Sequence, residues 1–97
     1  MIKITHSPGL IKIEGHAGYA PIGQDIVCAA VSTLLHTFLW SIDGLTDDVI
    51  NDFTAPGKAV IEYENLSDKG QVLMDSFLLG IEVIAHKYPE NVKLTRP

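Results

Sequence analysis

Residues 26–42 are the feature that most limits what this chain can fold into, because they form a long apolar stretch without a charged side chain. We predict a helix from Asp25 to about Ile42, with Asp25 as its N-cap and an end at Asp43-Gly44. Apolar side chains occur all round such a helix, which predicts burial on several sides. The large ones are Ile26, Val27, Val31, Leu34, Leu35, Phe38, Leu39 and Trp40.

Two hairpins are predicted around this helix. Residues 2–5 and 10–13 alternate apolar and polar side chains on either side of a Ser-Pro-Gly turn. An Ala-Pro-Gly turn likewise follows the apolar residues Val49, Ile50 and Phe53 and precedes an alternating segment, residues 59–64. Short alternating segments joined by such turns are typical of paired antiparallel strands.

A second helix and a last strand complete the predicted fold. Ser67 can cap a helix whose apolar residues fall three or four apart, and Pro89 ends it. Residues 92–94 can form a final short strand. The order ββαββαβ predicts one α+β domain over residues 1–97, with two helices packed on a mostly antiparallel sheet.

Charge and hydropathy exclude several classes of partner. Seven basic and twelve acidic residues give a net charge of -5, which argues against general binding of nucleic acid or anionic lipid. The apolar run at the N-terminus is too short for a signal peptide, and no later stretch is long enough to cross a bilayer free of polar residues. We therefore expect a cytoplasmic protein with no membrane contact. The hydrophobic share of 46% exceeds what a lone small domain needs, and the surplus suggests a subunit interface.

Cys28 is the only cysteine, so the chain can form neither an internal disulfide nor a thiolate-rich zinc site. If Asp25 is the N-cap, Cys28 is the third helical residue, where unpaired N–H groups and the helix dipole favour a thiolate. It could instead pack as a small apolar residue or form an intersubunit disulfide. The position makes a nucleophile plausible without requiring one.

His16 is the candidate base, because a glycine-rich loop of the length between it and Cys28 can fold back and bring the two side chains together. An imidazole there could accept the thiol proton and return it to a leaving amine. By spacing alone, His16 could equally be a plain surface or core residue. Asp25, Cys28 and Ser32 share one helical face, so Asp25 could orient His16 as well as cap the helix, and Ser32 could line the site or bond to the Cys28 carbonyl.

Other groups near the helix start have weaker signals. The N–H groups of Val27 and Cys28, with those of Gly23 or Gln24, could form an oxyanion hole. His36 lies about 12 Å along the helix from Cys28 at 1.5 Å per residue, too far to act as its base. No histidine spacing suggests a metal site, and no cofactor is expected.

The run from Gly15 to Ser32 resembles the signature of the bacterial ribosomal-processing cysteine protease family. That signature is Gly-His-Ala, a mobile loop, and Gly-x-Asp-Ile-Val-Cys-Ala-Ala-Val-Ser, and it is intact here. The resemblance implies a hydrolase with a His16/Cys28 dyad and Asp25 in support. It also implies a homodimer with an α/β/α sandwich, acting in ribosome biogenesis.

The implied substrate is the N-terminal extension of the large-subunit ribosomal protein numbered twenty-seven, cut after a motif with paired phenylalanines. Gly18 and Gly23 would allow a loop to close over this peptide, and Tyr19 and Ile22 would contact a phenylalanine. Tyr19 could instead simply pack on the domain. The alternative function is a non-catalytic ribosome-assembly or protein-binding module that uses the same groove.

Overall fold

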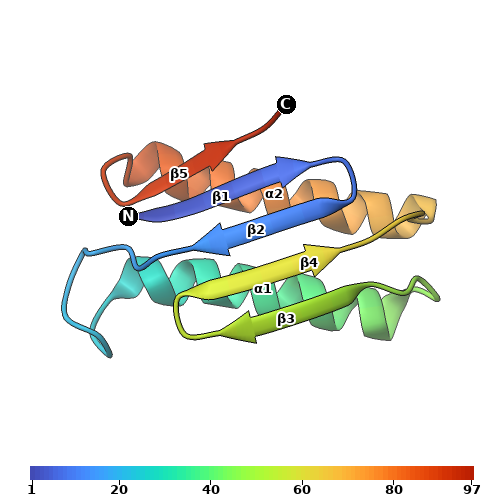
Figure 1. Ribbon diagram of the computed structural model, residues 1–97, viewed down its shortest axis with the longest axis horizontal. Coiled ribbons are helices and arrows are strands. Elements are labelled where there is room, and N and C mark those ends of the chain that lie inside the picture. Colours follow the sequence, from blue (N-terminus) through green and yellow to red (C-terminus); the bar gives the residue numbers. More distant parts are fainter.

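The computed structural model describes residues 1–97, and it places two helices behind one face of a five-stranded sheet (Figure 1). The predicted order ββαββαβ is confirmed. The elements are β1 (Ile2–Ser7), β2 (Leu10–Glu14), α1 (Ile26–Leu45), β3 (Asn51–Ala55), β4 (Lys58–Glu62), α2 (Asp68–Lys87) and β5 (Val92–Thr95).

The sheet has the strand order β3-β4-β2-β1-β5. Every neighbouring pair is antiparallel except β1 and β5, which are parallel, so the mostly antiparallel sheet is confirmed. The loop before α1, the β3–β4 turn and the turn between α2 and β5 all lie at one end of this sheet, on the left of Figure 1. Segments far apart in the sequence therefore meet at that end.

The core lies between the sheet and the helices. Alternation along the strands sends one set of side chains toward the helices, including Ile4, Ile11 and Ile61, each at most 1% exposed. From α2, Met74, Phe77, Leu78 and Ile81 are buried against this face. Alternate residues of the central strands, such as Lys3 and Lys12, are exposed on the other face. The single chain thus has two layers, one of helices and one of sheet, and does not by itself form an α/β/α sandwich.

Helix α1 differs from the prediction in two ways. It continues through Gly44 to Leu45, and Thr46 follows with extended backbone while its hydroxyl donates to the Ile42 carbonyl at 2.7 Å. Because a threonine side chain satisfies this carbonyl, the helix needs no glycine cap at position 44. Its buried residues form a single stripe, namely Val27, Val31, Leu35, Phe38 and Ile42. Burial on several sides is therefore wrong for the single chain.

Three large apolar side chains of α1 are exposed among polar neighbours such as Ser32 and Thr37. Ile26, Trp40 and Leu45 are 57%, 79% and 64% exposed. By length and composition alone this helix is apolar enough to cross a membrane, with a mean hydropathy of 1.5. Core helices of globular domains pass the same test, and the buried stripe of α1 packs in this domain's core.

Candidate active site

Asp25 fastens the loop before α1 to the start of the helix. Its Oδ1 accepts hydrogen bonds from the backbone N–H groups of Val27 and Cys28, both at 3.0 Å. Its Oδ2 accepts from the N–H groups of Tyr19 and Ala20, at 3.0 and 3.2 Å. The N-cap prediction is confirmed, and the second oxygen gives Asp25 a further task that sequence reasoning missed.

The hydrogen bonds also set the charge state of Asp25, which is only 9% exposed. Burial acts to raise the pKa of this carboxyl, but the four backbone N–H donors outweigh it and hold the pKa below its ordinary value. The carboxylate therefore stays ionised. All of its hydrogen bonds go to backbone groups, and none goes to His16.

Cys28 is the third residue of α1, as predicted, and is partly buried. Its sulfur accepts a hydrogen bond from the N–H of Ala17 at 3.2 Å. A backbone N–H directed at the sulfur and the first turn of a helix both place partial positive charge beside that atom. The environment of Cys28 therefore suits a nucleophile better than an inert core residue.

His16 lies just beyond the end of β2 and is exposed. Its ring packs on the β3–β4 turn, where a Cβ added at Gly57 would lie only 2.9 Å from Nε2. No hydrogen bond joins the ring to the Cys28 thiol, whose bond to backbone is the one from Ala17. The two side chains nevertheless line one cavity of about 240 Å³.

The walls of this cavity come from α1 and from the β3–β4 turn. Ser32 and His36 contribute from the helix, and residues 54–58 contribute from the turn. The back-bond considered for Ser32 is made by its neighbour Thr33, to the carbonyl of Ala29 at 2.8 Å. Sequence reasoning missed the role of the turn, for which the only local signal was a Pro-Gly pair that also marks an ordinary hairpin.

The expected oxyanion hole is wrong for three of its four donors. The N–H groups of Val27 and Cys28 are both bound by Asp25. That of Gln24 donates to the carbonyl of Pro21 at 2.9 Å. Local spacing put these groups near the thiol, but it could not reveal that neighbouring acceptors already bind them.

The loop that carries Gly18 and Gly23 is partly fastened to the domain. Both glycines have positive φ, +69° and +88°. The Tyr19 ring packs edge-on against Tyr88, with centroids 5.4 Å apart, although it is still 49% exposed. Ile22 is 88% exposed. Tyr19 is therefore packed on the domain, as one of the two interpretations held, while Ile22 is free for contact.

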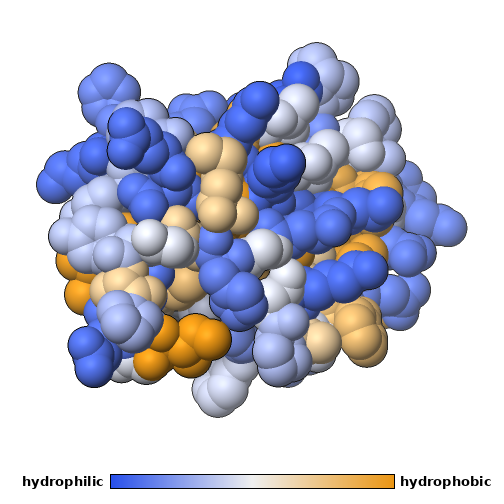
Figure 2. Space-filling view, turned by 60° about the vertical axis from the view of Figure 1, so that its left-hand side comes forward, coloured by the Kyte–Doolittle hydropathy of each residue, from blue (hydrophilic) through white to orange (hydrophobic).

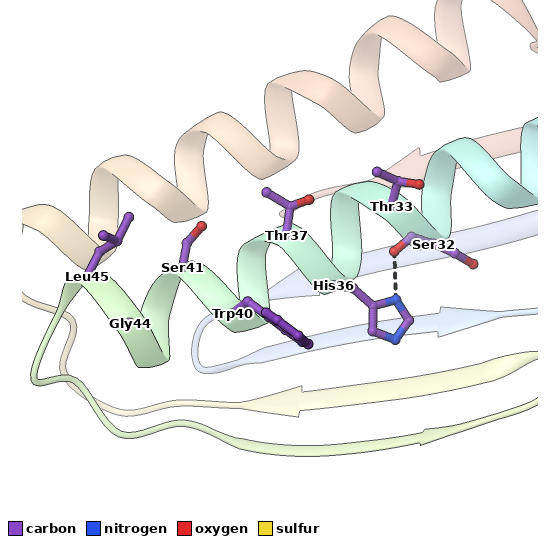
Figure 3. Close-up of a pocket in the computed structure, with 8 residues that line it drawn as sticks. All are labelled: Ser32, Thr33, His36, Thr37, Trp40, Ser41, Gly44 and Leu45. Atoms are coloured by element: carbon purple, nitrogen blue, oxygen red, sulfur yellow. Dashed lines mark hydrogen bonds between the residues drawn. The ribbon is translucent and has the colours of Figure 1, made fainter.

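A groove continues from the cavity along α1. His36 and Thr54 line both the Cys28 cavity and a second hollow between α1 and β3, about 400 Å³ in volume. Figure 3 shows Trp40 and His36 on the same side of α1, with His36 Nδ1–H donating to the Ser32 carbonyl at 2.8 Å. On the face in Figure 2, apolar residues form separate patches among hydrophilic side chains. No group of three or more His, Cys, Asp or Glu side chains is arranged to hold a metal ion.

Comparison with known proteins gives one consistent result. Residues 1–93 match the family model described as cysteine protease Prp. The ribosomal processing cysteine protease Prp of Mycoplasma pneumoniae is 33% identical over 92 residues, which span 95% of this chain and 91% of that protein. The protein of the same description from Staphylococcus aureus is 29% identical over 87 residues, 87% of this chain and 82% of its own.

The fold agrees with a solved structure from the same group. The ribosomal processing protease Prp of S. aureus, in complex with a covalently linked product peptide, superposes with a TM-score of 0.90 at 26% identity. The superposition covers 99% of this chain and 97% of that one.

Proposed function

Because the chain belongs to the family of ribosomal-processing cysteine proteases Prp, we propose that it cuts its substrate with a Cys28/His16 dyad. The substrate is the N-terminal extension of the large-subunit ribosomal protein numbered twenty-seven, cleaved after a phenylalanine-containing motif. The observation that carries the proposal is the position of Cys28 in the first turn of α1, with a backbone N–H on its sulfur and His16 across the same cavity. A product peptide covalently linked in the S. aureus relative agrees with covalent catalysis.

The dyad works by moving one proton between sulfur, imidazole and substrate. His16 takes the proton of Cys28 as the sulfur attacks the carbonyl carbon, and the carbonyl oxygen becomes an oxyanion. When the intermediate collapses, the C–N bond breaks and the imidazolium gives its proton to the leaving amine. Water, deprotonated by His16, then hydrolyses the thioester and restores the thiol.

For this step His16, whose ring the β3–β4 turn holds at Gly57, forms a hydrogen bond to the sulfur that the free enzyme lacks. Loop closure on substrate brings the two groups together, since catalytic hydrogen bonds are often formed only in the substrate complex. Gly18 and Gly23 act as the joints, and Ile22 covers the peptide. The net charge of -5 steers a basic ribosomal protein toward the enzyme, mainly by raising the association rate at moderate salt.

We also propose that the enzyme is a cytoplasmic homodimer. What supports the dimer is that three large apolar side chains of α1, Ile26, Trp40 and Leu45, are exposed in the single chain. Light scattering should give twice the chain mass of 10.6 kDa. Trp40→Glu should shift that value toward the monomer, and a monomeric wild-type protein at micromolar concentration would contradict the dimer.

The test of the dyad is cleavage of a peptide that carries the extension, followed by mass spectrometry. Cys28→Ala and His16→Ala should each lose the product, while the wild-type protein gives a single cut after phenylalanine. His86→Ala is the matched control, because His86 is an exposed histidine in the last turn of α2. Full cleavage by Cys28→Ala would refute the proposal. A stable wild-type complex without any product would favour the binding module instead.

A further inference from the structure

The backbone of Ala17 is held from two directions. Its N–H donates to the sulfur of Cys28 at 3.2 Å, and its carbonyl accepts a hydrogen bond from Asn91 Nδ2 at 2.9 Å. The residue itself is only 2% exposed. It directly follows His16 in the chain, so one short backbone segment connects both members of the dyad to a side chain 74 residues away.

Asn91 is itself firmly placed. Its N–H donates to the carbonyl of Tyr88 at 3.0 Å, and its carbonyl accepts from the N–H of Ile2 at 2.8 Å. The first bond closes the turn after α2, and the second joins this turn to the start of β1 just before β1 pairs with β5. Both backbone groups of Asn91 are thus used to fix the position from which its amide reaches Ala17.

A second contact joins the same two segments. The ring of Tyr88 packs edge-on against Tyr19, two residues after Ala17. The turn of residues 88–91 therefore holds the loop of residues 17–20 at two points, one polar and one aromatic. On its other side this loop is held by Asp25 through the N–H groups of Tyr19 and Ala20.

We propose that Asn91 is a positioning residue of the active site, which acts through Ala17 on the Cys28 sulfur. The inference rests on the proposed function for its consequences in peptide cleavage. Its physical basis is that Ala17 is followed by Gly18, at φ +69°, a joint that does not by itself fix the orientation of the preceding peptide. The amide of Asn91 fixes the Ala17–Gly18 peptide, and the Cα of Ala17 joins it to the His16–Ala17 peptide, whose N–H donates to the sulfur.

Losing this donor has two effects. The carbonyl of a buried residue loses its partner, which favours rotation of the peptide toward water. Rotation of this peptide shifts the Cα of Ala17, and so moves the adjoining His16–Ala17 peptide, with its N–H, away from the sulfur. A shift of about 1 Å in a reacting group costs up to about 100-fold in rate. The fold is held by the sheet and helices, so the loss falls on the site more than on the domain.

The variants that test this are Asn91→Asp and Asn91→Ala, with Glu90→Ala as the control. Asn91→Asp keeps the shape of the side chain but sets an oxygen against the Ala17 carbonyl, whereas Glu90 is the exposed neighbour. Alkylation of Cys28 by iodoacetamide, measured from pH 5 to 10, reports on the sulfur without requiring any peptidase activity. Cleavage of the extension peptide gives kcat and KM separately, and thermal melting reports on the fold.

For both Asn91 variants we expect an alkylation profile displaced to higher pH and a rate near pH 7 lowered by about 10-fold, since a hydrogen bond to a charged group contributes on that scale. kcat should fall with little change in KM, and Glu90→Ala should match the wild type. If Asn91→Ala unfolds, the isosteric Asn91→Asp decides the question.

The two proposals fail in different ways. An Asn91→Asp protein with a wild-type alkylation profile and wild-type kcat would overturn the positioning role while leaving the proposed function intact. A displaced alkylation profile in a protein whose wild type cuts no peptide would support the positioning role and refute the proposed function.

Discussion

A methyl group added at Gly57 would test whether the β3–β4 turn sets the position of the His16 ring. Gly57 has φ +72°, and a Cβ there would lie 2.9 Å from His16 Nε2. Left-handed backbone costs an L-residue about 1–2 kcal/mol. Ordinary contacts between such atoms are about 3.5 Å or longer, so the ring must move by about 0.6 Å.

Gly9→Ala is the matched control for this change. Gly9 sits in the other hairpin turn at φ +78°, and its added Cβ would lie 3.0 Å from the backbone oxygen of Tyr63. That turn is at the opposite end of the sheet from the site (Figure 1). The Tyr63 carbonyl oxygen is part of the backbone and moves aside less readily than the His16 side chain. Gly9→Ala should therefore lower stability at least as much as Gly57→Ala.

Both variants should therefore melt at lower temperature, by about 4–8 °C for each kcal/mol in a domain of this size. Only Gly57→Ala should also lose activity, by about 10- to 100-fold in kcat/KM, because its effect reaches the proposed base. Circular dichroism and a peptide-cleavage assay measure the two quantities. A Gly57→Ala protein with a lowered Tm and wild-type kcat/KM would refute the reasoning.

Three further predictions concern the fold around the site. The pKa of Asp25 is lower in the folded state than its ordinary value, so the carboxylate's contribution to stability is complete above about pH 4 and is lost as the pH falls through the lowered folded pKa. Asp25→Asn should therefore flatten the curve of Tm against pH in that range, and an unchanged curve would contradict this. Tyr88→Ala removes the ring that packs against Tyr19, so the amides of residues 17–20 should exchange hydrogen faster than in the wild type, while those of β4 should not. Exchange at residues 17–20 as slow as in the wild type would count against the contact. Ile61 is 0% exposed, so Ile61→Ala should lower the free energy of unfolding, measured by urea denaturation, by about 2–5 kcal/mol. Val60→Ala, on the outward-facing side of the same strand, should lower it by much less, and similar losses in the two variants would mean that the core is misassigned.

Local sequence was enough to predict what depends on neighbouring residues. The N-cap at Asp25, the first-turn position of Cys28 and the two hairpins follow from spacing and turn chemistry, and all three are confirmed. The end of α1 was missed because Thr46 supplies a side-chain hydroxyl to Ile42, a cap that the Asp43-Gly44 signal concealed. Short-range rules work where the partner lies within a few residues.

The parts of the site that could not be predicted depend on distant residues. His16 meets Gly57 because the N–H of Gly15 bonds to the carbonyl of Gly57 at 2.9 Å and extends the pairing of β2 with β4. Asn91 reaches Ala17 only because β5 pairs with β1 at the sheet edge. The spacing of residues along the chain does not reveal which strands pair. The residues that wall the cavity therefore could not be predicted from the sequence.

The parallel pairing of β1 with β5 affects when the site can form during synthesis of the chain. Residue 17 leaves the translating ribosome well before residue 91, and at about 5–20 residues per second the interval of 74 residues lasts roughly 4–15 s. During that time the nascent chain carries Cys28 and His16 but lacks the turn that orders the loop between them. If Asn91 positions the site as proposed, we expect the chain to gain peptidase activity only after β5 has paired with β1.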